Sequence, residues 1–224
     1  MRLDSQGRLP RTHLSDEVAA HLRAQIMSGA RRPGSFIRLD ETAAELGISV
    51  TPVREALLKL RGEGMVALEP HRGHVVLPLG RQDIDDIFWL QKTIATELAA
   101  TAAERITDAE IDNLEQINAA LAAAVATTDP EAIAAAESAF HRAFNNTARR
   151  IKLAWFLLHV ERYMPLSVYA ADANWGAAAV DSHRQLIAAL RRRDTAAVIE
   201  HTTWQCVDAA RRLTEKLQTS AIWS

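Results

Sequence analysis

The spacing of apolar residues predicts an amphipathic helix near the start of the chain. In the segment 14–27 an apolar side chain returns at every fourth position, at Leu14, Val18, Leu22 and Ile26. Ser15 is the expected N-cap of this helix, and Gly29 follows its end.

Two shorter helices and a hairpin are predicted next. Asp40 is expected to cap a helix over 41–46, and Gly47 ends it. Ser49 or Thr51 caps the following helix, which runs to about residue 63 with Pro52 in its first turn. Two short apolar runs, 65–68 and 74–77, then surround a turn and predict a β-hairpin.

Everything after Pro78 favours helices. Alanine-rich segments with interleaved large apolar residues predict six of them, near 83–105, 108–127, 130–147, 149–171, 175–193 and 195–218. Thr107 begins a capping box, and Asp129 and Asp194 are further expected helix starts. We therefore predict a mainly α protein, with a flexible arm at 1–13, a winged helix-turn-helix at 14–78 and an all-α antiparallel helical bundle at 83–218.

Composition and charge narrow the class of protein. Hydrophobic residues make up 48% of the chain and charged residues 24%, as in ordinary globular proteins. The single cysteine, Cys206, cannot form an internal disulfide, and no apolar run is long enough to span a bilayer, so a cytoplasmic location without membrane contact is expected. Residues 1–80 hold 11 basic and 9 acidic side chains, a net charge of +2, which permits DNA binding without requiring it.

A specific motif identifies the N-terminal third. The run LGISVTPVREAL at 46–57, followed by Leu60, Glu63-Gly64 and Arg72-Gly73, closely resembles the GntR family of bacterial transcription regulators. The resemblance implies that the helix after Gly47 lies in the major groove of DNA.

The residues of this motif suit different DNA contacts. Ser49 and Thr51 can bind phosphate at a helix start, and Arg54 can reach a guanine edge or a phosphate. The alternative is that the hydroxyls are only caps and Arg54 only a solvated charge. Val50 departs from the arginine common in the family, which favours an apolar contact with a thymine methyl. The predicted DNA-binding set is Arg38, Ser49, Val50, Thr51, Pro52, Arg54, Arg72 and Gly73.

The C-terminal part resembles the metal-binding FCD domain of the FadR subfamily. Glu137 and His141 are four residues apart, so both project from one helix face, and a late His183 joins them in the family pattern. The resemblance implies a site for one divalent ion, zinc, nickel or manganese. The family's fourth ligand is usually histidine, but here that position is Gln205, with His201 one turn earlier as a substitute. A buried polar cluster that contacts the effector without metal is the alternative.

The resemblance also implies a small effector, most often an organic acid. Its carboxylate would complete the metal's coordination or meet an arginine such as Arg142 or Arg184. Gln91 and Ala95 replace an Arg and a Glu that are common in the family. The aromatic residues are expected to lie mostly in the core, with one or two lining the ligand pocket: Phe140, Trp155, Phe156, Tyr163, Trp175 and Trp204.

These observations favour a homodimeric, DNA-binding regulator, expected to be a repressor, that binds a pseudo-palindromic operator and is not an enzyme. A metal-dependent hydrolase built on Glu137, His141 and His183 is the rival hypothesis. No candidate nucleophile or second base accompanies that cluster, and an enzyme does not need a winged-helix head. A helical scaffold that binds only protein leaves Ser49 to Arg54 unexplained.

Overall fold

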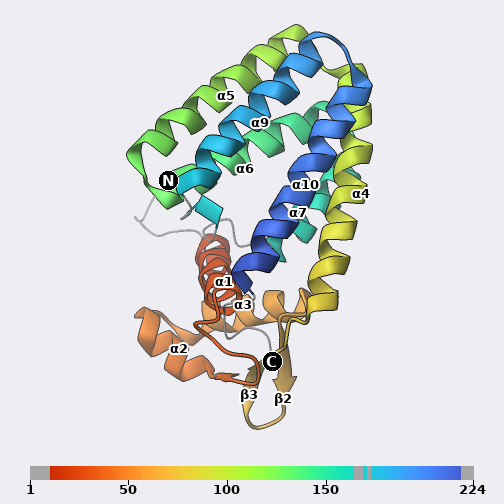
Figure 1. Cartoon of the computed structure of the whole chain (residues 1–224). Coiled ribbons are helices and arrows are strands. Elements are labelled where there is room, and N and C mark those ends of the chain that lie inside the picture. Colours follow the sequence, from red (N-terminus) through yellow and green to blue (C-terminus); the bar gives the residue numbers. More distant parts are fainter. Residues whose placement is uncertain (1–10, 164–168, 171–172, 218–224) are drawn as a thin grey trace. The chain divides into compact units, whose positions relative to one another are not determined.

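The computed structural model describes residues 11–163, 169–170 and 173–217, and the chain divides into two compact units (Figure 1). The first ends at Arg81, and the second spans Gln82–Lys216. The first unit combines helices with one small sheet and the second is helical, so the predicted fold class is confirmed. No helix within the described part of the chain is both long and apolar enough to cross a membrane.

The first unit has the winged helix-turn-helix order. Its elements are α1 (Arg11–Met27), β1 (Phe36–Ile37), α2 (Leu39–Leu46), α3 (Val50–Gly62), β2 (Val66–Glu69) and β3 (Gly73–Val76). The strands form an antiparallel sheet in the order β1-β3-β2. Leu22, Leu57 and Leu60 are fully buried where α1 packs on α3. Arg23 of α1 also forms a bidentate ion pair with Glu63, at the end of α3. The distances between the guanidinium nitrogens and the carboxylate oxygens are 2.8–3.0 Å.

Two predicted caps in this unit are wrong. Ser15 lies inside α1, where it is buried and accepts a hydrogen bond from Lys59 Nζ at 2.9 Å. Asp40 lies in the first turn of α2, and the N-cap is Arg38, which makes no side-chain capping bond. The short strand β1 was not predicted, because two residues carry no alternating pattern and the strand exists through its pairing with β3.

The second unit is a bundle of long helices. They are α4 (Arg81–Arg105), α5 (Asp108–Thr127), α6 (Pro130–Thr147), α7 (Ile151–Val160), the 3₁₀ turn η1 (Glu161–Tyr163), α9 (Ala173–Arg191) and α10 (Thr195–Leu217). The predicted helix 149–171 is wrong, because α7 ends at Val160. The capping box at Thr107 and the caps at Asp129 and Asp194 are confirmed.

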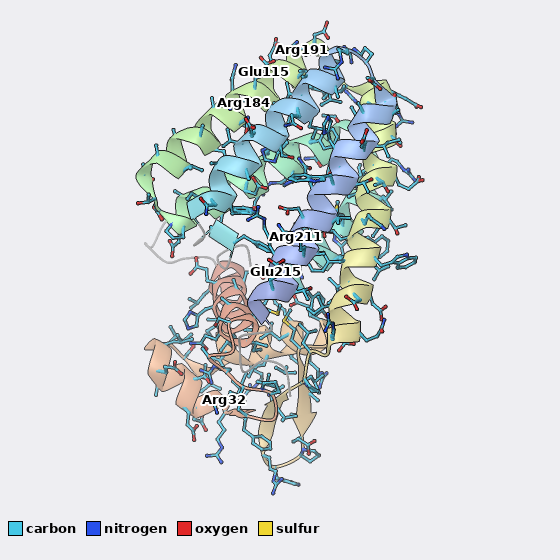
Figure 2. All side chains as sticks on the ribbon, in the orientation of Figure 1. Arg32, Glu115, Arg184, Arg191, Arg211 and Glu215 are labelled. Atoms are coloured by element: carbon cyan, nitrogen blue, oxygen red, sulfur yellow. The ribbon has the colours of Figure 1, made fainter. Side chains whose placement is uncertain are left out.

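The helices α5 and α9 pack closely along much of their length (Figure 2). A Cβ atom on Gly176 would lie 2.7 Å from Val125 Cγ2, so only glycine allows this approach. At the other end of the pair Arg191 binds Glu115 at 3.1 Å and also binds Asp112. Contacts at both ends of the α5–α9 pair thus fix the positions of the side chains that these two helices direct into the bundle.

Candidate functional site

The start of α3 presents polar groups outward. Ser49 precedes the helix in extended backbone (φ −74°, ψ 160°), and its hydroxyl makes no capping hydrogen bond. Thr51 and Arg54 are exposed, and among the described residues the Arg54 guanidinium has no ion pair or hydrogen bond. Val50 is half-buried and Pro52 is buried. Free N–H groups, hydroxyls and an unpaired cation at a helix start are suited to phosphate oxygens.

The hairpin β2–β3 carries an exposed arginine at its tip. The Arg72 guanidinium carbon lies 5.8 Å from the centre of the Phe36 ring. Gly73 has φ 104°, and a Cβ atom there would lie 3.0 Å from the Ile37 carbonyl oxygen. The close approach of β1 therefore requires glycine at this position whatever its role in DNA binding. Arg38 is exposed and pairs with Glu41 at 2.8 Å.

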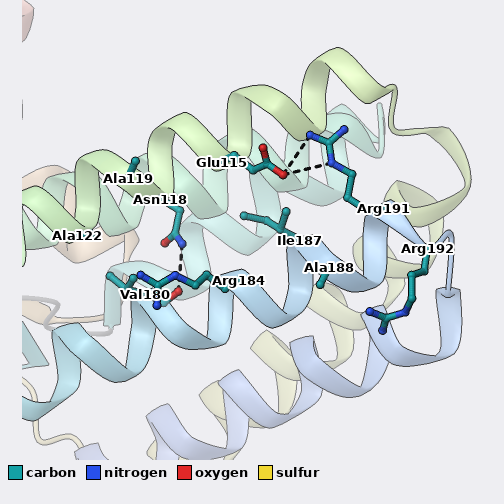
Figure 3. A pocket seen from close by; sticks show the side chains of 10 residues that line it. All are labelled: Glu115, Asn118, Ala119, Ala122, Val180, Arg184, Ile187, Ala188, Arg191 and Arg192. Carbon is teal, nitrogen blue, oxygen red and sulfur yellow. Dashed lines mark hydrogen bonds and ion pairs between the residues drawn. The ribbon is translucent and has the colours of Figure 1, made fainter.

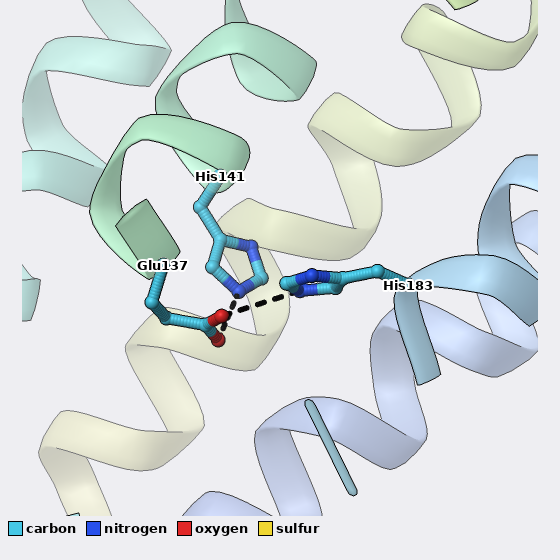
Figure 4. A group of neighbouring side chains, drawn as sticks. All are labelled: Glu137, His141 and His183. Carbon is cyan, nitrogen blue, oxygen red and sulfur yellow. Dashed lines mark hydrogen bonds and ion pairs between the residues drawn. The ribbon is translucent and has the colours of Figure 1, made fainter. Parts of the chain in front are cut away.

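In the second unit the structure brings together the three residues expected to form one site (Figure 4). Glu137 and His141 lie one turn apart on α6, and His183 comes from α9. His141 Nε2 is 3.2 Å from Glu137 Oε1, and His183 Nε2 is 3.6 Å from Glu137 Oε2. One ligand atom from each residue lies within 4.8 Å of the others, and Glu137 and His183 are buried. The ring of Phe140 stacks on His183 with centroids 3.6 Å apart.

Asn118 of α5 determines which nitrogen of His183 faces the cluster. Its Nδ2 donates to the main-chain carbonyl of Val180 at 3.1 Å (Figure 3), and a carbonyl oxygen can only accept. Oδ1 of Asn118 is therefore the atom that faces His183 Nδ1, at 3.2 Å. Because this oxygen also can only accept, Nδ1 carries the hydrogen and the lone pair of Nε2 faces Glu137.

In this cluster two hydrogen-bond acceptors, Glu137 Oε2 and His183 Nε2, face each other. Burial lowers the pKa of His183 to about 3, so its ring is neutral. Burial favours the neutral form of Glu137, but the hydrogen bond from His141 outweighs it and lowers the pKa of this carboxyl below its usual range. Among the described residues Glu137 Oε2 has no hydrogen-bond partner. An anionic oxygen and a nitrogen lone pair 3.6 Å apart are the arrangement that a bound cation satisfies.

A cavity of about 690 Å³ opens beside the cluster, lined by residues of α4, α6, α7, α9 and α10. Gln91 and Ala95 form part of its α4 wall, and Arg142 also lines it. Ser182 and Gln205 lie on the α9 and α10 side, where Gln205 Nε2 donates to Ser182 Oγ at 2.9 Å. Gln205 thus lines the cavity, and its amide is already hydrogen-bonded to the neighbouring Ser182 side chain.

Several expectations for this cavity are not met. His201 is not among the lining residues, and Arg184 lies in a different depression between α5 and α9, where it pairs with Asp181 at 3.0 Å. The aromatics are less buried than expected, because Trp155, Phe156 and Trp204 are 49%, 54% and 52% exposed. Trp155 and Trp204 line the cavity, which agrees with the expectation that one or two of the aromatics do so.

Two site residues were missed in the sequence analysis. Asn118 stands among apolar and polar residues of an ordinary amphipathic helix, and no motif marks it. Glu161 lines the cavity from the turn η1, where burial and the charge of Glu137 raise its pKa, partly offset by His141. It lay inside the wrongly predicted helix 149–171, so nothing distinguished it from a surface acid.

Comparison with known proteins decides the family. Residues 14–76 match the family described as bacterial regulatory proteins, gntR family, and residues 86–203 match the FCD domain. The chain belongs to the GntR family of bacterial regulators. It is 30% identical over 192 residues, 84% of this chain and 83% of the relative, to the "Probable D-xylose utilization operon transcriptional repressor" of Paenarthrobacter nicotinovorans.

A second relative supports the same conclusion. This GntR-family chain is 29% identical over 111 residues to the HTH-type transcriptional regulator McbR of Escherichia coli, an alignment that spans only half of each protein. The solved structure of E. coli McbR/YncC has a similar fold, with a TM-score of 0.74, 23% identity and coverage of 91% of this chain and 98% of that one. The matched families and relatives are transcriptional regulators and not enzymes, so the hydrolase hypothesis has no support.

Proposed function

We propose that this GntR-family regulator is a repressor whose operator affinity is controlled by a small organic acid bound in the cavity of the second unit. The cavity lies wholly within the described residues of that unit and is large enough for a metabolite. Its apolar walls carry a few convergent polar groups, as in ordinary ligand sites.

Glu137, His141 and His183 would hold one divalent metal ion beside this ligand. The opposed acceptors of Glu137 and His183 are the single observation that carries this part of the proposal. Separations of 3.2 and 3.6 Å between ligand atoms fit bond lengths of about 2.0–2.2 Å to one ion. Imidazole and carboxylate ligands suit zinc, nickel or manganese. The ion would supply open coordination positions for a carboxylate.

Operator DNA would be bound by the start of α3 and by the wing. The exposure of Ser49, Thr51 and Arg54 supports phosphate or base contacts there, and the exposed tip residue Arg72 supports a backbone contact. Pro52 is buried, so the proposed contact surface leaves it out. Two copies in a homodimer would present two α3 helices to a pseudo-palindromic site.

Metal content tests the central part of the proposal. The protein, purified without chelator or a nickel-affinity tag, is analysed by elemental mass spectrometry beside the His183→Ala variant. We expect about one equivalent of zinc, nickel or manganese per chain in the natural protein and almost none in the variant. Equal, trace amounts in both would mean that the cluster contacts the effector without metal.

A further inference from the structure

The carboxylate of Glu161 lies in the cavity wall without a partner. Glu161 is half-buried in the turn η1 and lines the same cavity as Glu137 and His141. Among the described residues its carboxylate oxygens form no ion pair and accept no hydrogen bond. Arg142 also lines the cavity, but its guanidinium does not bind Glu161. The cavity wall therefore contains a carboxyl group that no described protein donor satisfies.

Asp208, another acid in the wall of this cavity, shows the usual arrangement. Its carboxylate accepts hydrogen bonds from Arg211 and Arg212, each at 2.6 Å. Carboxylates with little access to bulk water are normally paired in this way, because an unpaired charge in a poorly solvated place destabilises the fold. The contrast between the two acids indicates that Glu161 serves a partner other than a protein side chain.

The charge of Glu161 acts on two of the proposed metal ligands. Burial raises the pKa of the Glu161 carboxyl, the charge of His141 opposes this rise, and the charge of Glu137 adds to it. Burial opposes protonation of His141, but its bond to Glu137, with a further contribution from Glu161, raises the pKa of this histidine. Two carboxylates that repel each other in a cavity with little solvent are stabilised by a divalent cation beside them.

The geometry points to Glu161 as a positioning residue that accepts a hydrogen bond from a water molecule on the metal ion. Its carboxylate does not belong to the three-residue group whose ligand atoms lie within 4.8 Å of one another, so a contact through water fits better than a direct bond. Gln205 is already hydrogen-bonded within the protein, so three protein ligands leave a coordination position for water. This inference rests on the proposed metal site and adds a carboxylate that supports it from η1.

A carboxylate in this position affects the empty site and the loaded site in opposite ways. Water bound to a divalent ion is a strong hydrogen-bond donor, and an anionic acceptor holds it in place. Supporting partners of this kind typically change metal affinity about 10- to 100-fold. Without the ion the same carboxylate has no partner and repels Glu137, so it destabilises the fold. A residue with a purely structural role would not show this change of sign.

The test compares metal-free stability with zinc affinity in the same variants. Glu161→Gln keeps the size of the side chain and removes its charge. In protein freed of metal by a chelator, we expect the melting temperature of this variant to rise by about 2–4 °C, because an unpaired acid is removed. Its zinc affinity, measured by competition with a chromophoric chelator, should fall about tenfold.

Asp208→Asn is the matched control. It removes an acid of the same cavity whose charge is already neutralised by two arginines. Its metal-free melting temperature should therefore fall, because the arginines lose their acceptor, while its zinc affinity stays near that of the natural protein.

The outcomes separate this inference from the proposed function. Unchanged zinc affinity in Glu161→Gln, or an equal loss in both variants, would overturn the role of Glu161 and leave the metal site in place. A lower melting temperature of metal-free Glu161→Gln would mean that the carboxylate supports the fold, and it would also overturn the inference. If the natural protein binds no zinc, the metal site and this inference both fail. Zinc binding as expected, with operator affinity that no effector changes, would contradict only the proposed regulation.

Discussion

Replacement of Asn118 by leucine should weaken both the fold and the metal site. The leucine has a similar size but leaves His183 Nδ1–H without its acceptor in a buried place, which costs about 1–3 kcal/mol. The Val180 carbonyl loses the donor from Asn118 but keeps its bond within α9, so its share is smaller. We expect the free energy of unfolding to fall by about 2–3 kcal/mol in total. A loss of about 2 kcal/mol corresponds to a fall of about 4–8 °C in the melting temperature.

The same change should reduce metal affinity, because the ring of His183 is then free to turn or to adopt the other tautomer. Loss of a supporting hydrogen bond of this kind typically lowers metal affinity about 10- to 100-fold, and we expect a loss of this size in Asn118→Leu. Zinc affinity is measured by competition with a chromophoric chelator, and unfolding is followed by circular dichroism.

Two matched variants make the result decisive. Asn113 is exposed on the same helix, so Asn113→Leu should change the free energy of unfolding by no more than about 0.5 kcal/mol. Asn118→Asp retains an acceptor for His183 Nδ1–H, and its zinc affinity should stay near that of the natural protein. If Asn118→Leu binds zinc as tightly as Asn118→Asp, the orienting role of Asn118 is refuted.

Three further predictions concern the two units separately. Arg54→Ala should weaken operator binding by about 1–3 kcal/mol in a gel-shift or anisotropy titration if the guanidinium contacts a base, whereas Arg184→Ala, outside the proposed DNA surface, should leave it unchanged. The double variant His141→Ala and His183→Ala should retain DNA binding and lose the response to effector. His74→Leu should stabilise the first unit by about 1 kcal/mol, because both ring nitrogens of the buried His74 lack partners in the described structure.

His74 also makes the first unit sensitive to pH. Burial, and secondarily Arg61, lower the pKa of His74 below its ordinary value of 6.5. The unfolded chain therefore takes up a proton below this pH that the folded chain does not bind, so the free energy of unfolding falls as the solution becomes more acidic. His74→Leu should reduce this slope in urea titrations at several pH values, and an unchanged slope would contradict the assignment.

Local signals explain which parts of the fold were predictable. The caps at Thr107 and Asp129 involve residues two or three positions apart, so the sequence alone predicts them. Ser15 failed as a cap because α1 begins at Arg11, and inside the helix its hydroxyl accepts from Lys59, more than forty positions away. The strand β1 was missed because its partner β3 lies far along the chain.

The candidate site shows a similar division. Glu137 and His141 share a helix face and could be paired from their spacing, and the resemblance to the FCD domain added His183. The role of Asn118 could not be predicted, because it depends on the carbonyl of Val180 across the contact between α5 and α9. Gln91 Oε1 is buried without a hydrogen-bond partner among the described residues, and this too is a property of the assembled cavity wall.

The position of Asn118 has a consequence for how this protein tolerates sequence change. The side chain must accept from His183 and donate to Val180 at once, within a buried space of fixed size. Asparagine is the amino acid whose short amide places both groups at this reach. Ala119 follows it directly and is exposed. A saturation library over α5 should accordingly return mostly asparagine, with aspartate as its main alternative, at 118 when selected for metal-dependent function, and a broad mixture of residues at 119.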